Sequence, residues 1–264
     1  MARSVGLRVI TWISMATNYS AEPFPHWVID DFLPPEDAWA AYQHFYEGDG
    51  AWTKREHLYC HAKETRTESL HPAVERALTQ LESPGIRQYV GQISDLPGLL
   101  HDPERFGGGQ HVIRRGGFLG VHADFTHSPT TGHRRVLNLL LYLNAHWHKG
   151  DGGELELWAS DMSQCAVKVE PIFNRAVLFR TSTTSFHGHP EPLKGEERRS
   201  LAVYYYNPDE PKQYIVTTGP SATQYNTLQW ITTTEGHLRT TDYRPRPWEY
   251  KLRLRRWLSK RIKG

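Results

Sequence analysis

The pattern with the clearest chemical potential is a His-x-Asp pair that is followed, far along the chain, by another histidine. The pair is His122 and Asp124, and the distant residue is His187 in the run SFHGHP. Residues i and i+2 of an extended segment point to the same side, so the imidazole and the carboxylate can face one metal ion. Two imidazoles and one carboxylate leave other coordination positions open, as in non-haem Fe(II) oxygenases. The pattern therefore predicts an iron site that activates dioxygen.

Two features weaken this pattern when it is taken alone. His189 lies two residues after His187 on the same side of an extended segment, so spacing does not exclude it as the third ligand. The chain also has 15 histidines, and a His-x-Asp pair can arise among them by chance. Support for the site must come from other residues.

A candidate anion-binding pair follows the histidines. Arg198 and Ser200 belong to the run RRSLAVYYY, which has the composition of a buried strand. A guanidinium at the end of such a strand suits a bidentate grip on a dicarboxylate, and a serine hydroxyl can add a hydrogen bond to the same group. Taken alone, Arg198 and Arg199 also fit the solvated end of a strand. The order of His-x-Asp, distal histidine and Arg-x-Ser favours the functional interpretation.

These motifs, in this order, resemble those of the 2-oxoglutarate- and Fe(II)-dependent oxygenases, and specifically the prolyl 4-hydroxylase-like branch. The resemblance covers roughly residues 23–208 and rests on the runs PHWVIDDFL, GGFLGVHAD, RRVLNLLLYLN, GGELELW, RAVLFR, SFHGHP and RRSLAVYYY. It implies a mainly β fold with supporting helices and a double-stranded β-helix, or jelly roll, as its core. It is specific for the family and silent on the substrate.

The resemblance also implies roles for individual residues. The implied iron ligands are His122, Asp124 and His187, because Ser185-Phe186-His187 best matches the family's approach to the distal ligand. His189 is then left beside the ligands or in contact with substrate. The residues implied to bind the cosubstrate are Arg198, Ser200, Tyr142 and Asn138. Asn138 is included because it lies four residues before Tyr142 on one strand face, and a buried amide in an apolar run needs a partner.

The activity that the resemblance implies is hydroxylation of an unactivated C–H bond. The cofactors would be Fe(II), 2-oxoglutarate as cosubstrate and O₂, with release of succinate and CO₂. Relatives that halogenate have Gly or Ala where this chain has Asp124. The carboxylate therefore favours hydroxylation, and desaturation or ring closure by the same chemistry stays open.

The substrate is expected to be a small amino-acid-like or biosynthetic metabolite. The reason is a group of basic residues around the first metal ligands, which suits an acidic group: Arg114, Arg115, His127, Arg134 and Arg135. Prolyl hydroxylation of a protein or peptide is the alternative within the family. A non-catalytic cupin-like metal-binding barrel is the alternative from another class. Nucleic acid is not an expected partner, because RRSLAVYYY lacks the arginine signature of the repair-type demethylases.

The elements that must position these residues are short strands. Seven runs between residues 107 and 207 have strand composition and are separated by turn signals: 110–114, 118–122, 136–144, 153–158, 166–170, 176–180 and 200–206. Their number and spacing indicate a sandwich or barrel. In the first hundred residues the pattern predicts strands over 26–30 and 52–66 and helices over 36–46, 72–81 and 85–96.

The extent of the resemblance implies three parts in the chain of 264 residues: an N-terminal extension (1–22), an oxygenase domain (23–210) and a C-terminal extension (211–264). From Arg244 to Gly264, nine basic residues and one acid give +8, so the rest carries −6 of the total of +2. Helical spacing of apolar residues there predicts a basic amphipathic helix. Two cysteines and no long apolar run predict a cytoplasmic protein without a membrane span. The start of translation, Met1 or Met15, and the oligomeric state stay open.

Overall fold

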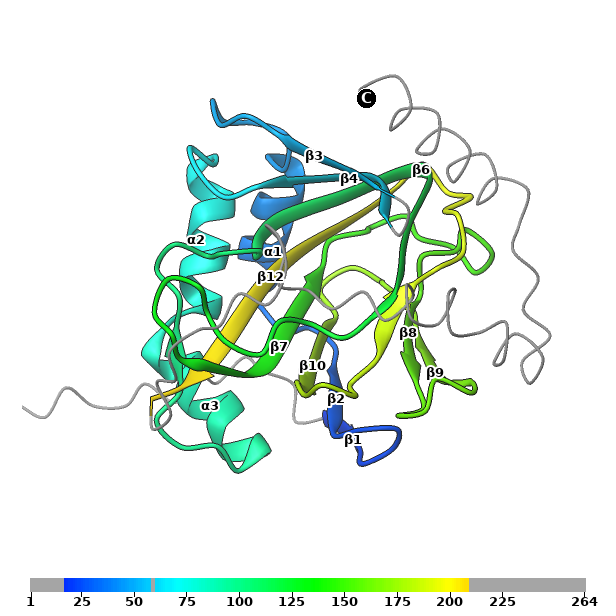
Figure 1. The fold of residues 1–264 in the computed structure, drawn as a ribbon. Coiled ribbons are helices and arrows are strands. Elements are labelled where there is room, and N and C mark those ends of the chain that lie inside the picture. Colours follow the sequence, from blue (N-terminus) through cyan, green and yellow to red (C-terminus); the bar gives the residue numbers. More distant parts are fainter. Residues whose placement is uncertain (1–16, 58–59, 209–264) are drawn as a thin grey trace, which may run out of the picture.

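A computed structural model describes residues 17–57 and 60–208 of the chain. Residues 1–16 of the predicted N-terminal extension and the whole predicted C-terminal extension, with its basic helix, lie outside the described residues. The described part confirms the expected class, because antiparallel strands dominate it and the sheet curls into a half-barrel with helices against one side (Figure 1). Among the described residues, no helix has the length and apolar character that crossing a membrane requires.

Within the described residues, twelve strands belong to one sheet. The strands are β1 (Thr17–Ser20), β2 (His26–Ile29), β3 (Thr53–His57), β4 (Cys60–Arg66), β5 (Leu100–His101), β6 (Gly109–His122), β7 (Arg134–Tyr142), β8 (Leu155–Trp158), β9 (Cys165–Val169), β10 (Ala176–Arg180), β11 (His187–His189) and β12 (Glu197–Asn207). The main order is β1-β2-β10-β7-β12-β6-β11-β8-β9, with β4 also on β6, β3 on β4, and β5 on β12.

The helices are α1 (Pro35–Gln43), α2 (Pro72–Leu81) and α3 (Pro84–Ser94), and they stand together on one side of the sheet (Figure 1). Each begins with a proline, which has a fixed φ suited to the first helical turn. The His71 ring caps α2 by accepting from the Ala73 amide, and the Ser83 hydroxyl caps α3. All three lie where the spacing of apolar residues predicts helices.

Strand β7 shows how the sheet separates a structural side from a functional side. Leu139 and Leu141 pack into the large core between sheet and helices. The alternate residue Tyr142 belongs to a smaller apolar cluster on the concave side, and Asn138 lines a cavity there. Because side chains of a strand alternate between faces, a single run of sequence builds the core and one wall of the site.

Two predicted boundaries differ from the structure. The runs at 110–114 and 118–122 form one bent strand, β6, rather than two strands. Its first half pairs with β12 and its second half with β11. Gly116 has a φ of +77°, and a Cβ on Gly117 would lie 2.7 Å from the Arg114 carbonyl oxygen, so these glycines allow the bend rather than end the strand. The predicted strand over 52–66 is in fact the β3–β4 hairpin.

Arg66 is a buried guanidinium that holds the loop after α1. It donates to the Gln110 side chain at 2.9 Å and to the carbonyls of Phe45, Glu47 and Gly48. We expect Arg66→Met to lower the free energy of unfolding by about 2–4 kcal/mol, since it leaves buried acceptors unpaired. Urea denaturation measures this. Replacement of the exposed Arg76 by Met is the control, expected to change stability by less than about 0.5 kcal/mol. Equal midpoints for both variants would contradict this role of Arg66.

Candidate metal and cosubstrate site

The sheet brings the three predicted metal ligands together. His122 is the last residue of β6, and His187, the first residue of β11, lies opposite it in the antiparallel pair. Asp124 follows β6 by two residues. Its carboxylate oxygens lie 3.5 Å from Nε2 of His122 and 3.3 Å from Nε2 of His187. One ligand atom from each of the three residues lies within 4.8 Å of the others, as a shared metal ion requires.

Backbone contacts fix the orientation of both rings. Nδ1 of His122 lies 2.8 Å from the Gly120 carbonyl oxygen, and Nδ1 of His187 lies 2.9 Å from that of Ser185. A carbonyl only accepts, so each Nδ1 carries the proton and each Nε2 presents its lone pair to the cluster. Burial also lowers the pKa of His122, which favours the neutral ring that a metal needs. The donor set therefore fits Fe(II).

Asp124 is held by two donors from the start of β7. Its Oδ2 accepts from Arg135 at 3.0 Å and from the Asn138 amide at 2.5 Å, and Arg135 Nε donates to Asn138 Oδ1 at 2.6 Å. Burial alone would raise the pKa of Asp124, but the Arg135 guanidinium outweighs it and keeps the pKa well below its usual range. Asn138, which is predicted to bind the cosubstrate, thus donates its amide to Asp124. It also lines the inner cavity described next. Sequence reasoning gave Arg135 no such positioning role.

Arg198 lies on the far side of an inner cavity of about 70 Å³, which is also lined by all three cluster residues. Its Nε donates to the Gly153 carbonyl at 2.7 Å and its Nη2 to the Tyr142 hydroxyl at 2.9 Å. The ion pairs of the described residues include no carboxylate for this buried cation. Ser200 also lines the cavity and lies opposite Tyr142 in the β12–β7 pair. Three predicted cosubstrate residues, Asn138, Arg198 and Ser200, therefore line one cavity that reaches the cluster, and Tyr142 contacts Arg198 beside it.

The structure separates the roles of His187 and His189. His187 joins the cluster, whereas His189 lines the inner cavity, and both its ring nitrogens lack a partner. Burial and the nearby Arg198 cation hold the pKa of His189 well below its usual range, so the ring is neutral. A neutral ring has one donor and one acceptor, and leaving both unpaired in the interior is costly. His189 is therefore available to a polar ligand in the cavity.

An outer cleft of about 630 Å³ opens over the same cluster. It shares Lys63, Leu119, His122, Asp124 and Tyr204 with the inner cavity. The basic residues predicted to gather there mostly do not line it: Arg114 pairs with Glu64 and Glu197, and Arg115 with Glu196. Arg135 does line the outer cleft, but its guanidinium forms an ion pair with Asp124. Neighbouring positions on a strand face opposite sides, which is why the group disperses.

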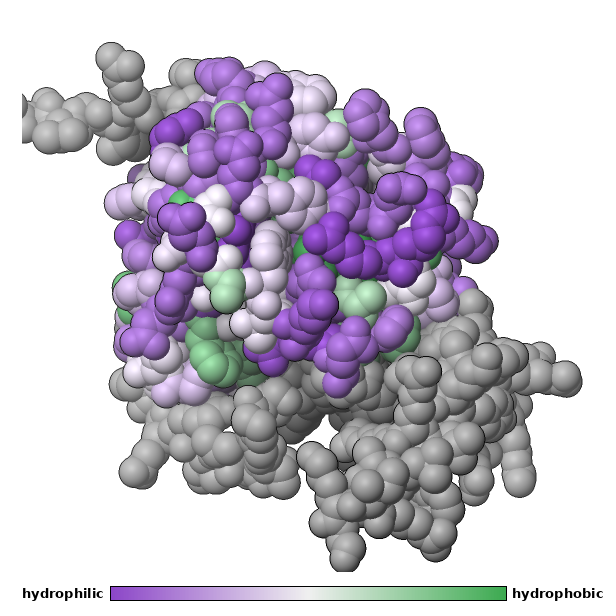
Figure 2. All heavy atoms as spheres, turned by 90° about the horizontal axis from the view of Figure 1, so that it is seen from above, coloured by the Kyte–Doolittle hydropathy of each residue, from purple (hydrophilic) through white to green (hydrophobic). Residues whose placement is uncertain are grey.

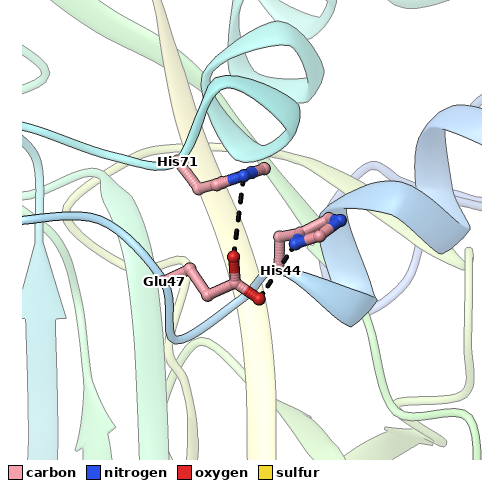
Figure 3. Close-up of side chains that lie close together, drawn as sticks. All are labelled: His44, Glu47 and His71. Atoms are coloured by element: carbon pink, nitrogen blue, oxygen red, sulfur yellow. Dashed lines mark ion pairs between the residues drawn. The ribbon is translucent and has the colours of Figure 1, made fainter.

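A second group of possible metal ligands joins α1 to α2: His44, Glu47 and His71 (Figure 3). Glu47 lies 2.9 Å from His44 Nδ1 and 3.7 Å from His71 Nε2, and the two rings stack at 4.1 Å. Nδ1 of His71 accepts the Ala73 amide, so its neutral ring carries the proton on Nε2, the atom that faces Glu47. That arrangement suits a hydrogen bond to the carboxylate rather than a metal.

Comparison with known proteins agrees with this geometry. Residues 108–206 match the model of the 2OG-Fe(II) oxygenase superfamily. A Pseudomonas putida prolyl-4-hydroxylase has a similar fold, with 21% identity and a TM-score of 0.50 over 69% of this chain and 92% of that one. HygX from Streptomyces hygroscopicus, solved with nickel, 2-oxoglutarate and hygromycin B, has 10% identity and a TM-score of 0.51 over 75% and 92%. No curated protein matches the sequence.

At these identities the solved structures establish the fold alone, and the family model matches residues 108–206. The matched region contains the strands that carry His122, His187 and Arg198. This region of the chain, which carries the candidate site, is therefore similar to the 2OG-Fe(II) oxygenase superfamily.

Proposed function

We propose that this enzyme hydroxylates an unactivated C–H bond of a small amino-acid-like or biosynthetic metabolite. The ligands to Fe(II) would be His122, Asp124 and His187, and the observation that carries this is that both Nε2 atoms face one carboxylate. When bound, Fe(II) supplies the activation of O₂ that couples decarboxylation of 2-oxoglutarate to oxidation of the substrate. The presence of Asp124 supports hydroxylation as the outcome.

The chain's own residues bind and orient the reactants. Arg198 offers its free guanidinium edge to the distal carboxylate of 2-oxoglutarate, and Ser200 adds a hydroxyl beside it. Tyr142 fixes the guanidinium plane through its hydroxyl and lies 4.7 Å beneath it. Arg135 and Asn138 hold the Asp124 carboxylate, so that the ligand set is oriented before the metal binds.

The outer cleft supports a small polar substrate. Its volume of about 630 Å³ is in the range of small-molecule sites. Its lining includes the cations Arg55 and Lys63 and the carboxylates Asp49, Glu68 and Glu104, which suits a zwitterion such as an amino acid. Prolyl hydroxylation of a peptide stays the alternative, and the experiment below separates the two.

Cys60 and Cys165 are free thiols, which supports the proposed cytoplasmic location.

The test is release of succinate from 2-oxoglutarate by the purified chain. We expect a slow rate that depends on Fe(II) and O₂, and a faster rate when the correct substrate is added. The substrate panel comprises free amino acids, their carboxamides, phosphorylated metabolites and end-capped proline peptides. Acceleration by a free amino acid supports the proposal, and acceleration only by capped proline peptides would establish the peptide alternative. Succinate release without a requirement for Fe(II) would contradict the metal assignment.

A further inference from the structure

The β3–β4 hairpin places two cations directly opposite each other on the wall of the outer cleft. Arg55 on β3 pairs in register with Lys63 on β4, and both line the cleft. Thr53 and Thr65, two residues away on each strand, form the next opposed pair on the same face. Like charges at opposed positions destabilise an antiparallel pair. The hairpin therefore has an unfavourable feature on the face that meets the substrate.

The other positions of the hairpin are balanced. Lys54 is in register with Glu64, which also pairs with Arg114 at 3.3 Å. Glu56 contacts His61 at 2.7 Å and accepts from the amide of Ala62 at 3.0 Å. The carboxylates of this hairpin are thus engaged away from the cleft. Opposite charges are paired at Lys54 and Glu64, which do not line the cleft. Like charges are paired at Arg55 and Lys63, which do.

Neither cation has a partner of its own. In the described part of the chain, the structure gives the side chains of Arg55 and Lys63 no hydrogen bond and no carboxylate within ion-pair distance. Burial lowers the pKa of Lys63, the charges of Arg55 and Arg198 lower it further, and the Asp124 carboxylate opposes this. An ammonium in this position gains from any anion that enters the cleft.

Local backbone geometry aims Lys63 at this position. The pairing of β4 with β6 shifts register between His61 and Lys63, and Ala62 has a φ of +50°. A bulge of this kind re-aims the side chain that follows it. Lys63 consequently lines both the inner cavity and the outer cleft, together with His122 and Asp124. Around the hairpin the face of the molecule is mostly hydrophilic (Figure 2).

We propose that Arg55 and Lys63 bind an anionic group of the substrate, a carboxylate or a phosphate, and so hold its C–H bond over the metal cluster. This rests on the proposed function, because it assigns the substrate's position relative to His122 and Asp124. The two cations would share one anion, which removes the cross-strand repulsion when substrate binds. The 2-oxoglutarate anion has its own cation in Arg198.

The test observes Lys63 directly, without turnover. Lysines of the Zn(II)- and 2-oxoglutarate-loaded protein are converted to ¹³C-dimethyl-lysine, which keeps the charge, and the Lys63 resonance is identified by its loss in Lys63→Met. Sodium acetate and inorganic phosphate are then titrated separately, with sodium chloride as the ionic-strength control. We expect a saturable shift of the Lys63 resonance. In Arg55→Met we expect the Kd of the anion to rise by about tenfold or more. Lys54, on the same hairpin, is the internal control and should respond only as it does to chloride.

Each outcome has a defined meaning. A response to acetate alone identifies a carboxylate substrate, and a response to phosphate alone a phosphorylated one. If Lys63 responds to neither anion more than Lys54 does, the inference is wrong. A Lys63→Met enzyme that loses affinity for 2-oxoglutarate rather than for acetate or phosphate also overturns it, because Lys63 would then serve the cosubstrate. Failure of the wild-type protein to bind metal and 2-oxoglutarate would instead overturn the proposed function, and the anion response of Lys63 can still be scored.

Discussion

Replacing Asp124 with alanine is expected to weaken metal binding strongly and to destabilise the fold. The carboxylate is the group that both Nε2 atoms of the cluster face, so Fe(II)-dependent succinate release should fall to background. It is also the partner of Arg135, whose side chain is 1% exposed. Removing one member of a buried ion pair costs about 3–5 kcal/mol, because the other charge is left uncompensated. Urea denaturation of the metal-free protein measures this cost.

His187→Ala separates the two effects. This variant loses a metal ligand but keeps the contact between Asp124 and Arg135, so it should lose the metal with a smaller loss of stability. Binding of Co(II), followed by its visible absorption, reports the metal without turnover. The interpretation is wrong if Asp124→Ala binds Co(II) as tightly as the wild-type protein does. Equal stability of the two variants would contradict the contribution of the ion pair between Asp124 and Arg135.

Arg198→Met is expected to raise the Kd of 2-oxoglutarate on the order of 100-fold. The guanidinium is buried, and the described residues supply it with no carboxylate, so a bound dicarboxylate would be its counter-ion. Truncation of one partner of a buried, hydrogen-bonded charge pair typically costs about 2–5 kcal/mol. Tyr142→Phe, which removes one hydrogen bond to Arg198, should raise Kd by about tenfold. Calorimetry on the Zn(II)-loaded protein measures both constants without turnover.

Arg199→Met is the matched control for Arg198. Arg199 is the next residue of β12 and therefore points to the other face, where it pairs with Glu197 and lies 4.8 Å over the Tyr42 ring. Its replacement should leave the Kd of 2-oxoglutarate unchanged. Equal increases in Kd for the Arg198 and Arg199 variants would show that the effect comes from damage to β12 and not from loss of an anion contact.

Local patterns allowed much of the framework to be predicted. The helix over Pro72–Leu81 and the strand over Ala176–Arg180 have the predicted bounds, since periodicity and flanking turn residues are properties of neighbouring positions. Strand β11 was not predicted, because three residues with a central glycine carry too little pattern. The sequence predicts a break where β6 bends, because two glycines signal a turn, and only the strands that pair with both halves show that β6 continues.

The chemistry of the site was encoded in residue types and order. The resemblance of the motifs to a family implies His122, Asp124, His187 and Arg198 as a group, and alternation along a strand places Asn138 and Tyr142 on one face. The pairing of distant strands settled the rest. It put His187 rather than His189 in the cluster, dispersed the arginines expected at the substrate and opposed Arg55 to Lys63. Such contacts depend on register between segments that are far apart in sequence, and register is fixed by how the whole sheet buries its two faces.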